Sequence, residues 1–244
     1  MNATYLRYEL LRLFRNRQAS IFSVVIPMVI FIIIASAAGR NATIVPGVTV
    51  ARYYLASMIA FGTLSAVLAG GARIAVERQV GWNRQLRLTP LPSGTYLRTK
   101  VVTSYLLAIG VVVLLTIAGL ALGVHLKAGS WAETVGLVIV ALIPFAALGI
   151  GLGHLINSDA MGPVIGIGTS LFAILGGAYF PIGGDSGFMH DVVRAIPSFW
   201  LVQAGKNGVG GQSWTVWAWV TVAAWTVVCA ALAGWAYQRD TKRS

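Results

Sequence analysis

Six long apolar segments dominate this 244-residue chain, and each is about as long as a helix that crosses a bilayer. A helix is suited to that setting because it satisfies its backbone hydrogen bonds within one segment, where lipid offers no water. Only 10% of the residues are charged, against about 25% in soluble domains. The sequence therefore predicts an all-α integral membrane protein, one domain over residues 1–244. The predicted spans are 19–38, 53–72, 101–124, 134–156, 161–180 and 214–237.

A polar island over residues 73–100 separates the second span from the third. It holds six Lys and Arg residues but a single anion, Glu77. Loops rich in Lys and Arg stay on the cytoplasmic side. With the N-terminus inside, only five of the 18 Lys and Arg residues fall outside. We therefore expect both termini in the cytoplasm and a multi-pass protein of the plasma or inner membrane. The net charge of +11 does not indicate a nucleic acid partner, because cations that flank spans bind lipid headgroups.

Residues 1–18, before the first span, have a helical period. The apolar side chains on one face are Leu6, Leu10, Leu13 and Phe14, whereas the arginines fall elsewhere. This pattern predicts an amphipathic helix that lies in the headgroup plane of the bilayer. The alternative is a charged flank that only orients the first span.

The segment 181–212 lies on the outer side and is apolar for a loop. Its apolar residues from 188 to 196 share one helical face, and Pro197 ends that run. Ser198 can cap a second short helix that begins with Phe199 and Trp200. We expect a re-entrant pair of short helices that dips into the membrane or covers the outer end of the bundle. The alternative is an ordinary exposed loop, which its apolar content disfavours.

The predicted spans contain no Asp, Glu, Lys or Arg in their interiors, which disfavours an ion-coupled carrier. The chain has no phosphate-binding loop motif and no common catalytic motif. Its single cysteine, Cys229, excludes an internal disulfide and a cysteine zinc cluster. We therefore expect no enzyme activity, metal or cofactor in this chain, and an energy source in another chain. Small residues four apart predict close helix packing at Gly62 with Ala66, Gly119 with Gly123, Gly149 with Gly153, and Gly162 with Gly166.

The island carries Glu77-Arg78, Gly81, the run 86–92, Tyr96-Leu97 and Lys100. The fifth span leaves the membrane through residues 176–181, which Ile196-Pro197 and Phe199 follow. In this order and on these sides, the motifs resemble the ABC-2 type transporter permeases, the membrane subunits of ATP-binding cassette exporters, of the drug or antibiotic efflux type. The resemblance covers essentially the whole chain.

The resemblance implies a dimer of permeases, each docked on a separate ATPase subunit that binds ATP and Mg²⁺. Residues 74–87 would form a coupling helix inserted into the ATPase, and residues 1–18 a connecting helix against it. The implied coupling residues are Glu77, Arg78, Gly81, Arg84 and Arg87. The implied extracellular gate comprises Phe180, Pro181, Pro197, Phe199 and Trp200.

The cargo is predicted from the walls of the bundle, which should be apolar with a few hydroxyl and aromatic side chains. Such walls suit hydrophobic or amphipathic compounds such as drugs, antibiotics or lipids. The candidate path residues are Phe61, Thr63, Ser65, Phe145, Thr169, Ser170 and Phe172. The same residues could equally serve helix packing. Two other functions stay open at this point: a non-transporting assembly or sensor subunit of a larger complex, and an intramembrane enzyme.

Overall fold

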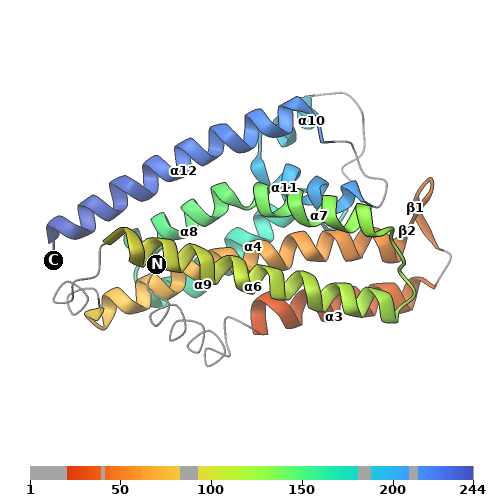
Figure 1. The fold of residues 1–244 in the computed structure, drawn as a ribbon, viewed down its shortest axis with the longest axis horizontal. Helices are drawn as coiled ribbons and strands as arrows, with labels where there is room; N and C mark the ends of the chain where they lie inside the picture. Colours follow the sequence, from red (N-terminus) through yellow and green to blue (C-terminus); the bar gives the residue numbers. More distant parts are fainter. Residues whose placement is uncertain (1–20, 40–41, 83–92, 181–187, 209–213, 244) are drawn as a thin grey trace.

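The computed structural model describes residues 21–39, 42–82, 93–180, 188–208 and 214–243, and it shows a bundle of long helices with one short β-hairpin (Figure 1). The elements are η1 (Ile21–Val25, a π-helical turn), α3 (Ile26–Ala38), β1 (Thr43–Val45), β2 (Val48–Thr49), α4 (Val50–Gln79), α6 (Ser93–Ala121), α7 (Ala128–Ala141), α8 (Ile143–Leu155), α9 (Ser158–Leu175), α10 (Phe188–Arg194), α11 (Pro197–Asn207) and α12 (Val216–Arg243). Pro46 and Gly47 connect the antiparallel strands, and Gly47 has a φ of 79°, which favours glycine.

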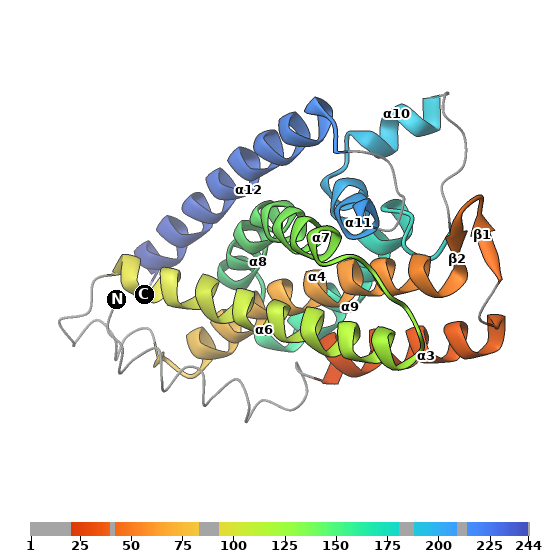
Figure 2. The same ribbon diagram turned by 45° about the vertical axis from the view of Figure 1, so that its right-hand side comes forward.

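The long helices run between two ends of the bundle (Figures 1 and 2). At one end, α4 finishes at Gln79, α6 begins at Ser93 and α12 finishes at Arg243. We call this the polar end, and the opposite end, which carries β1 and β2, the hairpin end. Both flanks of the polar island therefore lie at the same end of the bundle as the C-terminal end of α12, as expected from the sequence.

The predicted fold class is confirmed: the chain is an all-α multi-pass membrane protein. Among the described residues, five helices are long and apolar enough to cross a membrane, and Ser23–Ala38 is a shorter apolar helix. The five are Val50–Gln79, Gly94–Ala121, Ala128–Leu155, Ser158–Leu175 and Val216–Asp240. Each corresponds to one predicted span, and the shorter helix corresponds to the first.

The structure corrects two predicted boundaries. The fourth span divides into α7 and α8 at Leu142, because Pro144 has no N–H to donate and its ring crowds the preceding turn. The helix that holds the second span does not end at residue 72, since α4 continues to Gln79. Glu77 and Arg78 therefore lie on the same continuous helix as that span, and no separate helix begins at residue 74. The helix stops before Gly81, which has a φ of 71°.

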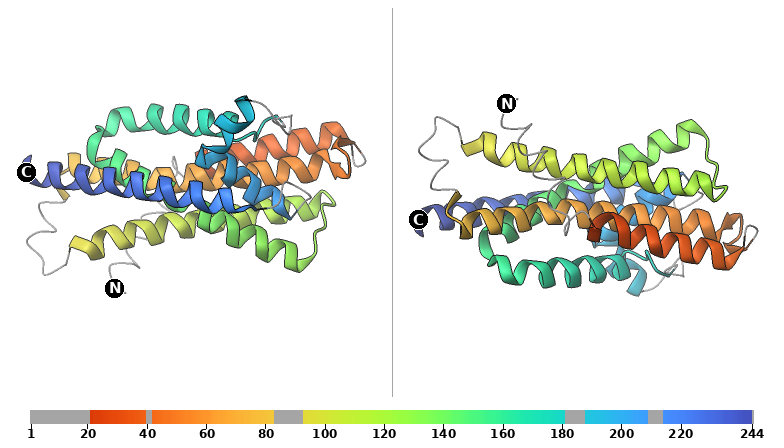
Figure 3. Two further views of the ribbon diagram at one scale, coloured as in Figure 1. Left: turned by 90° about the horizontal axis from the view of Figure 1, so that it is seen from above. Right: turned by 90° about the horizontal axis from the view of Figure 1, so that it is seen from below.

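The helix α4 forms the centre of the bundle and is almost wholly buried, whereas α9 and α12 are mostly exposed. Figure 3 shows α4 between α6 and α9. The short helix α11 packs against α7, α4 and α9, and nearly all of its residues are buried. The helix α11 thus lies inside the bundle near the hairpin end.

Candidate functional site at the polar end of the bundle

Three consecutive residues at the end of α4 each bind a different neighbouring helix. Glu77 faces α6, Arg78 faces α8 and α12, and Gln79 accepts a hydrogen bond from the Ser158 hydroxyl at the start of α9. Successive side chains on an α-helix point about 100° apart, so one turn can reach several neighbours. The last turn of α4 is therefore the point at which the helices of the polar end are joined.

Glu77 lies in a buried ion pair with α6. The Lys100 ammonium donates to Glu77 Oε1 at 2.5 Å, and the Tyr96 hydroxyl donates to Oε2 at 2.7 Å. Glu77 is 2% exposed and Lys100 is 1% exposed. Tyr96 and Lys100 stand four residues apart, so they share one face of α6. Both oxygens of this carboxylate thus hold α6 against α4, and its side chain is turned away from the molecular surface.

Arg78 joins α4 to α8 and α12. Its guanidinium donates to the Gly153 carbonyl at 3.0 Å and pairs with Asp240 Oδ1 at 2.8 Å. The other Asp240 oxygen lies 3.1 Å from Nδ1 of His154, whose ring packs edge to face on Tyr237. We call Arg78, Gly153, His154, Tyr237 and Asp240 the α12 joint. A planar guanidinium suits this role because it can bind two acceptors in fixed directions.

Glycines bring α4 and α8 into backbone contact beside the joint. A Cβ on Gly71 would overlap the Gly149 carbonyl oxygen, and one on Gly153 would lie 2.5 Å from the carbonyl oxygen of Gly71. The predicted close packing at Gly149 and Gly153 is therefore observed. Gly62 also packs closely, because a Cβ at this position would lie 2.9 Å from the Ser23 carbonyl oxygen.

The other predicted glycine pairs behave differently. A Cβ on Gly119 would meet the side chain of Leu55 at 2.6 Å, whereas no atom lies within 4 Å of one on Gly123. Gly162 and Gly166 on α9 likewise have no such neighbour among the described residues. Close packing within the described part of the chain is therefore not observed at Gly162 and Gly166.

The hairpin end holds most of the predicted gate residues. Pro197, Phe199 and Trp200 are buried in α11, whereas Phe180 is exposed; Pro181 lies outside the described residues. The Trp200 indole donates to the Arg194 carbonyl at 2.8 Å, which docks α10 on α11. The structure thus brings three of the five predicted gate residues together.

Lys206, near the end of α11, is a buried cation that the sequence did not single out. Its ammonium donates to the Gly177 carbonyl at 2.7 Å and lies 3.9 Å from the ring centre of Tyr53, whose hydroxyl donates to the same carbonyl. Lys206 is 6% exposed, and burial lowers its pKa to about 7. One carbonyl at the exit of α9 therefore holds α11 and α4 together.

Most of the predicted path residues pack inside this chain. Phe61, Thr63, Ser65, Phe145 and Thr169 are buried, Phe172 is half-buried against Phe145, and Ser170 is exposed. The hydroxyls of Thr63 and Ser65 donate to carbonyls one turn earlier in α4. In this conformation their contacts are those of helix packing, and a role in a path stays a prediction.

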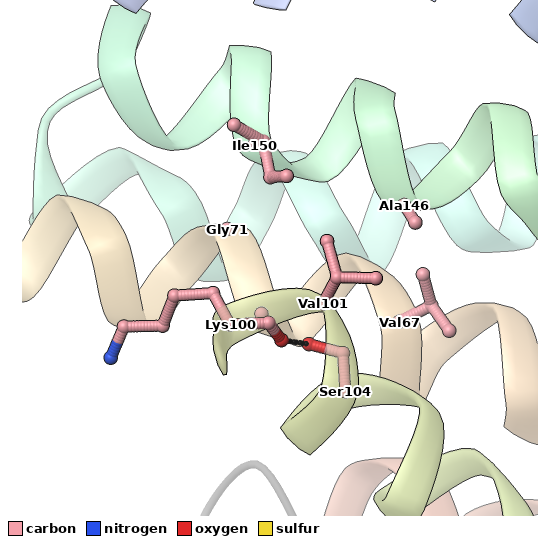
Figure 4. A pocket seen from close by; sticks show the side chains of 8 residues that line it. Val67, Gly71, Lys100, Val101, Ser104, Ala146 and Ile150 are labelled. Carbon is pink, nitrogen blue, oxygen red and sulfur yellow. Dashed lines mark hydrogen bonds between the residues drawn. The ribbon is translucent and has the colours of Figure 1, made fainter. Parts of the chain in front are cut away.

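A hollow lies between α4, α6 and α8, beside the Glu77–Lys100 pair. Figure 4 shows the side chains of Val67, Val101, Ala146 and Ile150 around it, while the Lys100 ammonium points away. Its volume is about 10 Å³, which is room for about one water molecule. This hollow is far too small for a drug-sized compound.

The remaining predicted residues cannot be placed. Leu6, Leu10, Leu13 and Phe14 of the expected connecting helix, and Arg84 and Arg87 of the expected coupling helix, lie outside the described residues. Within the part of the chain that is described, no group of three or more His, Cys, Asp and Glu side chains could hold a metal ion.

Sequence reasoning missed two partners at the polar end. From the sequence alone, Lys100 was only a cation of the polar island and part of the family resemblance, and Asp240 had no assigned role. Each left a signal in the sequence: Lys100 follows Tyr96 by one helical turn, and Asp240 is the only anion in the basic C-terminal stretch.

Comparison with known proteins gives two matches. The sequence profile of the ABC-2 family transporter proteins matches residues 41–236, which is most of the chain. A protein of Bacillus subtilis (strain 168), named "Putative transport permease YvfS", is 24% identical over 208 residues, which cover 84% of each chain.

Proposed function

The chain belongs to the ABC-2 family of transporter proteins, and from this membership we propose that it is the permease subunit of an ATP-binding cassette exporter. A separate ATPase subunit would bind ATP and Mg²⁺ and supply the energy. The distribution of Lys and Arg supports an orientation with the polar end and both termini in the cytoplasm, in the plasma or inner membrane.

The part of this proposal that concerns coupling rests on the buried link between the two helices that flank residues 83–92. Glu77 near the end of α4 is bound by Tyr96 and Lys100 near the start of α6. A partner that pushes on residues 83–92 would therefore move α4 and α6 together, because the two helices are already bound to each other. In this proposal Glu77 couples by joining α4 to α6, while the segment with Arg84 and Arg87 contacts the ATPase.

We place the translocation path between two permease copies, for two reasons. The hollow between α4, α6 and α8 fits only about one water molecule, and most candidate path residues pack within the chain. The outward faces of α6 and α9 are apolar, and either could line a path or meet a second copy. Their exposed side chains include Ile109, Val113, Ile117, Ile167, Leu171 and Ile174. Apolar walls favour hydrophobic or amphipathic cargo, such as a drug, an antibiotic or a lipid.

The test is reconstitution of the chain with an ABC ATPase subunit from the same organism that binds it. We expect a stable complex that moves a lipophilic fluorescent dye across vesicle membranes when ATP is added, and no movement with an ATPase that cannot hydrolyse ATP. A complex that forms and hydrolyses ATP but moves neither a lipophilic compound nor a water-soluble oligosaccharide would overturn the exporter proposal and favour an assembly or sensor subunit. A water-soluble oligosaccharide in the same vesicles tests the cargo class.

A further inference from the structure

The helix α12 connects the two ends of the bundle and is held by polar contacts at both. It has 28 residues, which makes it about 42 Å long at 1.5 Å per residue. At the polar end, Asp240 binds Arg78 and His154. Between its ends, α12 packs mainly along α8, and Figures 1 and 2 show it approaching α4 only towards the polar end.

At the hairpin end, α12 is attached to the short helices α10 and α11. The Trp225 indole donates to the Ala195 carbonyl at 2.8 Å, and the Thr221 hydroxyl donates to the Arg194 carbonyl at 3.3 Å. An apolar cluster with residues from α10, α11 and α12 also joins these three helices. Its members are Val193, Phe199, Trp200, Ala218 and Val222.

We propose that α12 transmits the movement of α4 from the polar end to α10 and α11, and that Asp240 is the positioning residue that connects α12 to α4. This inference rests on the proposed exporter function. Arg78 stands next to Glu77, so a displacement of the last turn of α4 acts on α6 and on the α12 joint at once. A long helix resists compression along its axis, and α12 can therefore carry that displacement to the Trp225 contact.

The geometry of the joint supports a directional role for Asp240. Its two carboxylate oxygens have different partners, Arg78 on α4 and His154 on α8. Arg78 in turn holds the Gly153 carbonyl next to His154. These bonds close a ring of contacts through three helices, which fixes the end of α12 in more than one direction. A single hydrogen bond would leave α12 free to pivot.

The experiment uses the reconstituted complex with its ATPase. Cys229 is replaced by alanine, and Val220, an exposed residue of α12 near the Trp225 contact, is replaced by cysteine and labelled with an environment-sensitive fluorophore. Asp240→Asn removes the charge that binds Arg78. Arg239→Gln is the matched control, because Arg239 is the exposed neighbour of Asp240 and lies over the Trp235 ring.

We expect ATP to change the fluorescence in the parent complex and in Arg239→Gln, and the change to be lost in Asp240→Asn. We also expect Asp240→Asn to lower the amount of cargo moved per ATP hydrolysed by about tenfold, which lies within the ~5- to 150-fold range of coupling between sites. Binding of the ATPase subunit and the melting temperature of the complex should stay unchanged. The exchange of Arg78→Asp with Asp240→Arg should restore part of both signals, which a loss of folding alone would not allow.

The results separate this inference from the proposed function. If the parent complex moves no cargo and shows no response to ATP, the exporter proposal fails. If the parent responds and Asp240→Asn responds equally, with the same cargo moved per ATP, the role of Asp240 is refuted. If Asp240→Asn does not fold, Arg78→Lys is used instead. This variant keeps the positive charge but cannot bind the Gly153 carbonyl and Asp240 in the fixed directions of a guanidinium. An unchanged fluorescence response in Arg78→Lys would also refute the role of Asp240.

Discussion

Breaking the Glu77–Lys100 pair should destabilise the protein strongly, whereas replacing both partners should not. The change is Glu77→Gln, which leaves the Lys100 ammonium facing a neutral amide. Because Lys100 is 1% exposed, water cannot replace the lost carboxylate. Removing one partner of a buried ion pair costs about 3–5 kcal/mol, since the remaining charge stays buried without compensation.

That free energy converts into a large change in melting temperature. For a chain of 150–250 residues, 1 kcal/mol corresponds to about 2–4 °C, so Glu77→Gln should lower the midpoint by about 6–20 °C. Adding Lys100→Met removes the remaining buried charge and fills the space with an apolar side chain. The double variant should recover most of the loss, because neutral replacement of both partners is often close to neutral in stability.

The assay is thermal unfolding of the detergent-solubilised protein, followed by the fluorescence of its eight tryptophans. The matched control is Glu133→Gln, an exposed carboxylate on α7, which should shift stability by no more than about 0.5 kcal/mol. If Glu77→Gln melts as Glu133→Gln does, the carboxylate is not buried against Lys100. A double variant less stable than Glu77→Gln would contradict the reasoning on charge.

Two other changes test the packing and the hairpin end. The pKa of Lys206 is lowered from 10.5 to about 7 by burial, so the unfolded chain binds one more proton between these pH values. Stability should therefore rise with pH above 7, by up to about 5 kcal/mol at 1.36 kcal/mol per pH unit. Lys206→Met should remove that rise in melting curves recorded over a range of pH. An identical pH dependence of the melting temperature in both proteins would refute the lowered pKa of Lys206. Gly71→Ala forces a methyl group against the Gly149 carbonyl and should lower the free energy of unfolding by about 1–3 kcal/mol or more. Gly136→Ala is the control, because its methyl group would meet no atom within 4 Å. Equal melting points of the two variants would contradict the close packing at Gly71.

The fold class could be predicted because it depends on composition and period. Apolar runs of span length leave few folds open in lipid, and the side of each loop stays a prediction from counting Lys and Arg. The boundaries needed more than counting. No glycine or proline lies between residues 72 and 80 of α4, so the apolar run ends there while the helix continues. Hydropathy predicts which residues lie in the membrane. The end of a helix depends instead on where its backbone hydrogen bonds stop, and in α4 this is at Gln79, seven residues after residue 72.

The site was predicted less completely because its partners lie far apart in the sequence. The sequence shows Glu77 as the single anion of the polar island, but it does not show that this carboxylate is buried against α6. Its partner Lys100 is 23 residues away, and Asp240 is 162 residues from Arg78. No local period reveals such pairs; they follow from which helices pack together. The place of α11 could not be predicted for the same reason, since an apolar short helix can dip into the membrane or cover the outer end of the bundle.

The central claim is that the energy for transport enters from a separate ATPase through the polar end. The most direct measurement compares vesicles that contain the chain with its ATPase against vesicles that contain the chain alone, with ATP present in both and a lipophilic dye as cargo. The account predicts that dye accumulates against its gradient only when the ATPase is present. Accumulation of the dye by the chain alone would contradict it.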